Sequence, residues 1–229
     1  MPADRLIRIL ARLNSEKGNE PGSARLCTVC AEVLDMTGAG IMLMSDNTQR
    51  GSVCSSDSVS ALIEDLQFTL GEGPCVDAYR LNRPILADDL ARRGSARWAA
   101  FSPPVAAAGA RAVFAFPMQV GSISLGAIDL YRDEPGSLSD AQHADALVMA
   151  GVAARAVLGM SVPDLEIGSD IRLVVHQASG MVSVQLLVSV SQALVRLRAY
   201  AFANNRLLDD VAADVVARRL RLDSRESDL

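Results

Sequence analysis

Side chains that suit nucleic-acid binding gather near the end of the sequence. The stretch LVRLRAYAFANNR, residues 194–206, contains Arg196, Arg198, Tyr200 and Arg206. Arginine neutralises phosphates, and splayed RNA bases stack on aromatic or guanidinium planes. Arg196 and Tyr200 are four residues apart and therefore share one face of a helix. These residues could bind RNA, and Tyr200 could equally cover the edge of a helical bundle.

Charge is distributed unevenly along the chain. The formal net charge is -5, yet residues 172–222 hold seven arginines and three aspartates, which gives that stretch +4 and the rest of the chain -9. An acidic body with a basic helical end is expected of a sensor joined to a nucleic-acid reader. A solvated helix face would carry the same charge, so charge alone does not decide between the two.

The sequence contains four cysteines, Cys27, Cys30, Cys54 and Cys75. Cys27 and Cys30 form a CxxC, which is compatible with a metal or redox site. No second CxxC and no nearby histidine completes a tetrahedral metal site. Both residues instead belong to a helical apolar stripe in ARLCTVCAEVLDMTG, which favours packing in a core, with redox sensing as the alternative. We expect the thiols to stay reduced, without a disulfide framework.

Patterns of hydrophobicity change near residue 160, because helical and strand-like patterns alternate before it and only helical patterns follow it. We expect an N-terminal helix within residues 1–19, then an antiparallel sheet with helices within residues 20–160, which is an α+β domain ending in a long helix. A three-helix bundle is expected within residues 161–229. The expected bundle helices cover residues 167–188, 191–203 and 207–222.

The segment LGEGPCVDAYRLNRPILADDL, residues 70–90, is the most distinctive part of the first domain. Together with GAGIMLM before it and ARAVFAFPMQVGSISLGAIDLY after it, it resembles a GAF domain as found in bacterial regulators. The resemblance implies a pocket between the sheet, helices and loops that binds a cyclic nucleotide, a haem, a tetrapyrrole, another small molecule or nothing. The implied pocket residues are Cys54, Cys75, Phe114 and Phe116.

Histidine placement limits the cofactors that such a pocket would hold. No histidine falls in the pocket region to ligate haem, and no cysteine-histidine pair marks a chromophore attachment. We therefore expect no metal and no haem, and the ligand stays unknown. Some GAF-fold proteins reduce free methionine sulfoxide with pocket cysteines, so Cys54 and Cys75 leave a redox enzyme as an alternative.

The last helices carry a second set of ordered motifs. The segment from Ile171 to Val216 has a glutamine-alanine pair, a glycine followed by a hydrophobe, an arginine-rich middle and a final hydrophobic-alanine pair. This pattern resembles an ANTAR domain. The implied RNA-binding residues are Gln177, Ser179, Gly180, Arg196, Arg198, Tyr200 and Arg206. One departure is Ser179, which stands where many members have a lysine.

The two resemblances together imply a GAF-ANTAR regulator. Proteins with ANTAR domains bind paired RNA hairpins in nascent transcripts and prevent a terminator from forming. We therefore expect a signal-responsive transcription antiterminator that is not an enzyme. A helix-turn-helix regulator of DNA is the alternative, because three short helices with basic ends also suit that geometry. A protein-interaction adaptor without nucleic-acid contact is a third class.

Two further expectations concern partners and location. The helix predicted at residues 140–160 has a broad apolar stripe, which favours a homodimer through this helix. No apolar run has the length of a membrane span, and the N-terminus lacks the apolar core of a signal peptide, so we expect a cytoplasmic protein without membrane contact. The stripe consists of Ala146, Leu147, Ala150, Ala153, Ala154, Val157 and Leu158.

Overall fold

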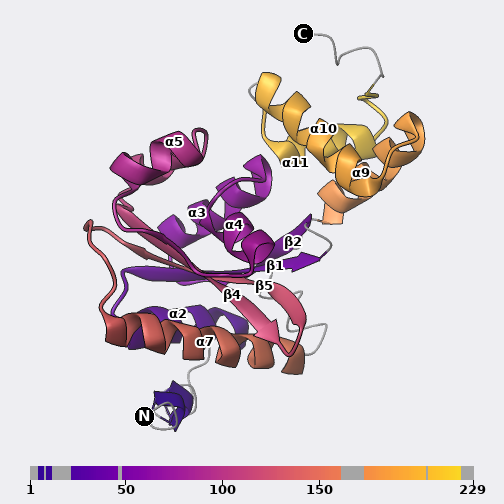
Figure 1. Cartoon of the computed structure of the whole chain (residues 1–229). Helices are drawn as coiled ribbons and strands as arrows, with labels where there is room; N and C mark the ends of the chain where they lie inside the picture. Colours follow the sequence, from indigo (N-terminus) through magenta and orange to yellow (C-terminus); the bar gives the residue numbers. More distant parts are fainter. Residues whose placement is uncertain are drawn as a thin grey trace. The chain divides into compact units, whose positions relative to one another are not determined.

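The computed structural model describes residues 5–7, 9–11, 22–45, 48–160, 173–204 and 206–222. Its contacts divide the chain into two compact units, residues 1–171 and 172–229, which Figure 1 shows in the colours of the sequence. The segment at residues 161–172, where the join between the domains is predicted, lies outside the described residues. Residues 5–7 and 9–11 are helical within the expected N-terminal helix.

A five-stranded sheet forms the centre of the first unit, and its strands follow the order β2-β1-β5-β4-β3. Every neighbouring pair is antiparallel, and β2 and β3 are the edge strands. This arrangement confirms the predicted antiparallel sheet with helices. The strands are β1 (Gly38–Ser45), β2 (Thr48–Ser55), β3 (Ile85–Ala87), β4 (Ala112–Val120) and β5 (Ile123–Arg132).

Helices cover both faces of this sheet (Figure 1). On one face lie α2 (Gly22–Leu34) and α7 (Asp140–Gly159), and on the other lie α3 (Ser58–Leu70) and α4 (Pro74–Leu81). The segment between β3 and β4 forms η1 (Leu90–Gly94), α5 (Ser95–Arg97) and α6 (Ser102–Ala107). The two helix pairs therefore define two separate interiors, one on each face of the sheet.

Helix starts follow the local sequence closely. The hydroxyl of Ser139 accepts a hydrogen bond from the Gln142 amide, and the Gln142 side chain accepts one from the Ser139 amide, so the predicted capping box begins α7. At the start of α3, Asp57 caps the helix by accepting from the amides of Val59 and Ser60. Such caps satisfy amides that have no partner inside the helix.

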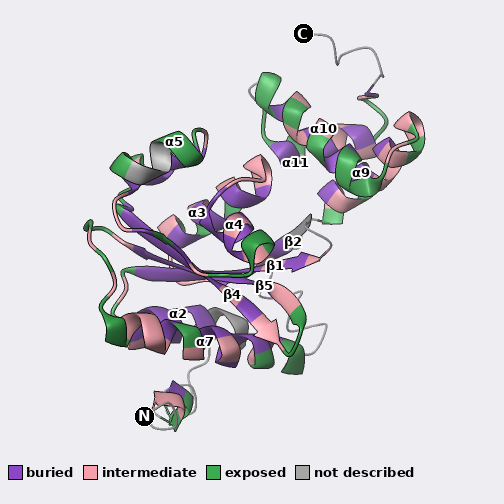
Figure 2. Cartoon of the chain, in the orientation of Figure 1, coloured by how far each residue is buried: buried purple, intermediate pink, exposed green. Residues whose placement is uncertain are grey.

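The apolar core of the first unit lies between the sheet and the α2–α7 pair, where Figure 2 shows buried positions on both layers. Phe116 on β4 packs edge-on against His143 of α7, with ring centroids 5.3 Å apart. Strand residues alternate between faces, so the neighbours of these core residues on β4 and β5 point toward α3 and α4. Large core residues on this face include Leu34, Ile41, Phe114, Phe116, Met118, Ile128 and Leu130.

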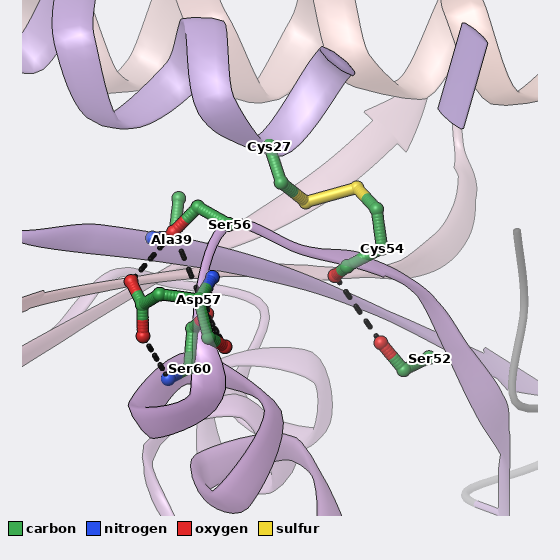
Figure 3. Close-up of a disulfide and its surroundings, with 7 residues drawn as sticks. All are labelled: Cys27, Ala39, Ser52, Cys54, Ser56, Asp57 and Ser60. Carbon is green, nitrogen blue, oxygen red and sulfur yellow. Dashed lines mark hydrogen bonds between the residues drawn. A yellow bond between two sulfur atoms is a disulfide. The ribbon is translucent and has the colours of Figure 1, made fainter. Parts of the chain in front are cut away.

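A disulfide between Cys27 of α2 and Cys54 of β2 crosses this interior (Figure 3). The expectation that these cysteines stay as free thiols is therefore wrong. Cys54 pairs with Ile41 in the β1–β2 ladder and reaches the α2 side of the sheet, with its Cα 5.9 Å from that of Cys27. Cys30 is a buried free thiol in the same core, in agreement with the packing interpretation.

The second unit is formed by α9 (Leu173–Leu186), α10 (Val190–Ala203) and α11 (Leu208–Val216), which pack pairwise against one another. The third helix ends six residues before the predicted end, because the backbone turns at Arg218, whose φ is 60°. Among the residues that the structure describes, no single helix has the length and hydropathy of a membrane span, although α9 and α10 reach those values together across a 104° bend. The shared core contains Val175, Ala178, Val182, Ala193, Leu194, Leu197, Ala201, Leu208, Val211, Ala212 and Val215.

Candidate functional site

The four pocket residues predicted in the first unit do not line one pocket, because three of them share the apolar core and the fourth lies on the other face of the sheet. Phe114 and Phe116 are buried in the core beneath α7, and Cys54 is bonded to Cys27 of α2. Only Cys75, on α4, lies on the opposite face of the sheet. The prediction of a shared pocket is therefore corrected. The residues of β4 that point to one face of the sheet and those that point to the other are both apolar. The sequence therefore did not indicate toward which face each phenylalanine points.

A buried polar cluster occupies the α3–α4 face instead, and we call Glu64, Gln67, Cys75 and Asp129 the polar cluster. Gln67 of α3 donates from Nε2 to Asp129 Oδ2 of β5 at 2.8 Å. Its Oε1 accepts from the backbone amide of Cys75 at 2.7 Å. One glutamine thus joins two helices to the sheet, and no more than 2% of any cluster residue is exposed.

Glycines make room for the polar cluster. A β-carbon on Gly40 of β1 would lie 2.2 Å from Oε1 of Glu64, and one on Gly73 would lie 2.6 Å from Gln67. Gly73 also adopts a φ of 137°, and Pro74 follows it at the start of α4. The GEGP motif therefore provides the turn that brings the Cys75 amide to Gln67.

Two carboxyl groups without charge partners lie in this cluster. Within the described residues, no hydrogen bond of ordinary geometry reaches either oxygen of Glu64 or Oδ1 of Asp129, although the two carboxyl groups are close enough to share a proton. Burial, followed by the negative charge of Asp129, raises the pKa of Glu64 well above its usual range. Burial also raises the pKa of Asp129 to about 6, although its hydrogen bond from Gln67 acts in the opposite direction. Glu64 therefore retains a proton that a neighbouring acceptor or ligand can use.

We expect Glu64→Gln to stabilise the protein at pH 8 by about 1 to 3 kcal/mol, because a neutral amide replaces a carboxyl group whose ionisation is disfavoured by burial and by Asp129. The pKa of Glu64 is raised on folding, so the native state binds more protons than the unfolded state above about pH 4. The free energy of unfolding of the wild type should therefore fall as pH rises through that window, and the slope should flatten in the variant. Urea unfolding between pH 4 and 8 measures both effects.

Glu134→Gln is the matched control, because Glu134 is an exposed glutamate of the same unit. This control should leave the pH dependence of wild type unchanged. A Glu64→Gln variant with the same pH slope as wild type would contradict the buried-proton interpretation.

A groove in the second unit brings together residues from α9 and from the segment after α11. Its cavity volume is about 740 Å³. Residues of α9 line it at the spacing of one helix face, and the chain beyond α11 adds two arginines and a leucine. The groove residues are Gln177, Gly180, Met181, Val184, Gln185, Arg218, Leu220 and Arg221.

The turn at Arg218 places these arginines beside α9. The Arg218 amide donates to the carbonyl of Val215 at 3.0 Å, and the amides of Arg219 and Leu220 donate to Asp214. A left-handed backbone at an arginine costs about 1 to 2 kcal/mol relative to the ordinary helical conformation. Glycine would avoid that cost, and it is the residue most often found at such a turn after a helix.

Ion pairs divide the arginines of this unit into two groups. Asp214 binds Arg206 at 2.6 Å and Arg219 at 2.7 Å. Those contacts lower the pKa of Asp214 and raise that of Arg206. No ion pair joins Arg218 or Arg221 to another described residue. Arg218 and Arg221 therefore place positive charge in the groove that a phosphate could neutralise.

Of the predicted RNA-binding residues, the structure brings only some to this groove. Gln177 and Gly180 line it, and a β-carbon on Gly180 would meet no atom within 4 Å, so this glycine is not required by helix packing. Arg196, Arg198 and Tyr200 lie partly exposed on α10, which contributes none of the described groove residues. Arg206 is paired with Asp214.

The structure corrects the prediction that Ser179 binds RNA. Ser179 is 1% exposed, and its hydroxyl donates to the carbonyl of Val175 at 2.7 Å inside the bundle. A helical position between Ala178 and Gly180 need not share the face of Gln177, because successive residues are turned by about 100°. Arg218 and Arg221 were missed as specific sites because nothing local in the sequence places them beside α9.

The arrangement of the described side chains limits which cofactors the protein could bind. Within the described ranges, no group of three or more histidine, cysteine or acidic side chains has the arrangement of a metal site. A small molecule could exchange hydrogen bonds with Glu64 and with Oδ1 of Asp129 in the polar cluster.

Comparison with known proteins provides the family context. The GAF domain family model matches residues 24–157. The first unit is similar to the GAF domain of a phosphoenolpyruvate-protein phosphotransferase from Acinetobacter, with 12% identity, a TM-score of 0.50 and coverage of 69% of this chain and 93% of that chain. The corresponding domain from Coxiella burnetii has 14% identity, a TM-score of 0.50 and coverage of 69% and 92%. A search of curated proteins found no match.

Proposed function

Because the chain belongs to the GAF domain family, we propose that its first unit is a sensor and that its second unit is the RNA-binding output of that sensor. A GAF domain suggests signal-responsive regulation. The acidic first unit and the basic last helices suit this division of labour, since residues 172–222 have a net charge of +4 and the rest of the chain has a net charge of -9.

The groove beside α9 is the observation that supports RNA binding most strongly. It combines two arginines without ion-pair partners among the described residues, two glutamine amides and an apolar lining that includes Met181 and Val184. Arginines would neutralise phosphates, glutamine amides would hydrogen-bond to base edges, and the apolar lining would accept an unstacked base. A hairpin loop offers such bases, whereas the bases of an intact duplex stay stacked.

Sequence pattern narrows the proposal to an antiterminator. The motifs along α9, α10 and α11 resemble an ANTAR domain, which implies binding of paired hairpins in nascent transcripts. Arg196 and Tyr200 on α10 would form a second contact surface, with the base stacking on Tyr200. Such a regulator would act in the cytoplasm and would need no catalytic residue.

A small-molecule signal would be received on the α3–α4 face of the sensor. The polar cluster offers a protonated carboxyl group at Glu64 and an acceptor at Asp129 Oδ1, so the ligand would both accept and donate hydrogen bonds, as an amide does. The cluster joins α3, α4 and β5, and a ligand bound to it would change how these elements pack.

A homodimer through α7 would bring together the RNA-binding units of two protomers. Five of the seven residues of the predicted stripe pack inside the first unit, which leaves Leu147 and Leu158 exposed. These leucines are eleven residues apart and share a helix face with Gly151, beside which a β-carbon would meet no atom. Arg5 pairs with Asp145 of α7 at 2.6 Å, which anchors the N-terminal segment beside this surface.

Transcription in vitro tests the proposed function. A template with a hairpin pair upstream of an intrinsic terminator should give several-fold more full-length transcript when the protein is added, because bound hairpins exclude the terminator stem. Mutating the loop bases without changing the stem should abolish the effect. Unchanged readthrough on templates that the protein binds would contradict antitermination and leave RNA binding as a separate activity.

A further inference from the structure

The Cys27–Cys54 bond lies outside both candidate sites and joins an element of one sheet face to an edge strand. The bond, drawn in Figure 3, joins Cys27 of α2 to Cys54 of β2. In the described sheet β2 is an edge strand and pairs with β1. The β1–β2 pairing has register shifts at Ile41/Met42 and at Leu43/Met44. An edge strand with an interrupted ladder opens at lower cost than a central strand, because fewer hydrogen bonds must break.

Burial of the two sulfur-bearing residues differs slightly. Cys27, on the sheet-facing side of α2, is completely buried, whereas Cys54 is 4% exposed on the edge strand. Opening of β2 would therefore expose the sulfur of Cys54 first. Attack on a disulfide depends on access to one sulfur atom along with the reactivity of the incoming thiolate.

We propose that the Cys27–Cys54 bond is a site of thiol–disulfide exchange with a dithiol, and that its reduction loosens the N-terminal cap of α3. A thiolate of the dithiol attacks Sγ of Cys54 and forms a mixed disulfide, while Cys27 leaves as a thiolate and takes a proton. The second thiol of the reductant then attacks the mixed disulfide and releases Cys54. The dithiol becomes a disulfide, and the protein gains two protons and two electrons.

The route from the disulfide to α3 is short and continuous. Two residues after Cys54, the hydroxyl of Ser56 accepts from the Ala39 amide and donates to Asp57 Oδ2, each at 2.9 Å. Asp57 Oδ1 in turn accepts from the amides of Val59 and Ser60, each at 2.8 Å. Figure 3 shows the disulfide and this cap on the same stretch of chain.

Further contacts hold the cap against the sheet on the α3–α4 face. Tyr131 of β5 donates its hydroxyl hydrogen to Asp57 Oδ1 at 3.2 Å. A β-carbon on Gly38 would lie 2.1 Å from Asp57 Oδ2, so the cap sits directly on β1. Release of β2 from α2 therefore reaches the start of the helix that carries Glu64 and Gln67. Redox state on one face of the sheet would thus alter the polar cluster on the other.

The remaining two cysteines do not take part in the exchange. Burial raises the pKa of Cys30 to about 12, and burial also raises the pKa of Cys75 well above its usual range. Both thiols therefore stay protonated and are poor nucleophiles. Cys30 is nevertheless three residues from Cys27 on α2, so a Cys27–Cys30 bond is the pairing that peptide mapping must distinguish.

Hydrogen exchange on the full chain tests the proposal without reference to RNA. Oxidised protein and protein treated with dithiothreitol should be compared by mass spectrometry. Reduction should accelerate exchange of the Val59 and Ser60 amides at least about tenfold, with a melting temperature lower by about 5 to 15 °C. Alkylation of the folded, reduced protein should label Cys54 and Cys27 ahead of Cys30 and Cys75.

Two substitutions provide the comparison. Cys30→Ala should keep the full response to dithiothreitol, because it leaves the bond intact. Cys54→Ser should exchange at the reduced rate in both conditions. Equal exchange at Val59 and Ser60 in oxidised and reduced wild type would overturn the proposal, as would mapping of a Cys27–Cys30 bond in the oxidised protein. None of these measurements depends on RNA binding. The redox proposal and the proposed RNA-binding function can therefore fail independently of each other.

Discussion

Replacement of Arg218 by glycine together with Arg221 by alanine should weaken hairpin RNA binding at least about a hundredfold, because each charge-assisted hydrogen bond contributes about 1.5 to 3 kcal/mol. The slope of log affinity against log salt should fall by about 1.4 to 1.8, the contribution of two phosphate contacts. Glycine suits the φ of 60° at position 218, so the helical unit should be no less stable than wild type. Titration of a labelled hairpin at several salt concentrations measures both changes.

A charge-matched control separates the groove from general positive charge. Arg206→Ala with Arg219→Ala also removes two arginines, but both of these are bound to Asp214. Exposed ion pairs of this kind contribute roughly 0 to 1 kcal/mol to stability, so the variant should fold. Its hairpin affinity should fall less than about fivefold. Equal losses in the two double variants would show that binding depends on net charge rather than on the groove.

Introducing glutamate at Leu147 and Leu158 of α7 should convert a dimer into a monomer at micromolar concentration. Each leucine buried on association contributes about 1.5 to 3 kcal/mol, and symmetry doubles the number lost. The dimer dissociation constant should therefore rise at least about a thousandfold. Sedimentation velocity over a range of concentrations gives the oligomeric state directly.

Leu86→Glu is the control for this second change. Leu86 is 42% exposed on β3, an edge strand without a role in the proposed interface. This variant should sediment as the wild type does. A dimer that persists in the α7 variant, or a wild type that is monomeric throughout, would contradict the assignment of α7 as the interface.

Local sequence features predicted much of the first unit. The apolar runs of β1, β4 and β5 and the turn at Gly121 indicated an antiparallel sheet, and Ser139 with Gln142 indicated the start of α7. Each of these features depends on residues close together in the chain. They also supported the GAF resemblance that the family model confirms over residues 24–157.

Features that depend on register or on tertiary approach could not be predicted in the same way. Cys27 and Cys54 are 27 residues apart, and they meet only because α2 packs on the side of β2 to which Cys54 points. Phe114 and Phe116 alternate with apolar neighbours, so pattern alone does not assign their face. The polar cluster joins positions 75 and 129 through Gln67, which no local motif marks.

The groove of the second unit shows the same limit. Gln177 and Gly180 were selected from a motif, and the structure brings both to the groove. Arg218 and Arg221 reach them only because the chain reverses at an arginine in a left-handed conformation. Asp214 forms ion pairs with Arg206 and Arg219. The pair with Arg219 also depends on the turn at Arg218.

Competition between a hairpin RNA and a duplex DNA of equal charge is the most direct test of RNA recognition by the second unit. Phosphate attraction alone would hold both nucleic acids, whereas unstacked loop bases are present only in the hairpin. At 150 mM salt, we predict that the full chain prefers the hairpin by at least about a hundredfold and that the groove variant loses most of this preference. Equal affinity for the two nucleic acids, with equal losses in the groove variant, would contradict RNA recognition and favour a helix-turn-helix regulator of DNA.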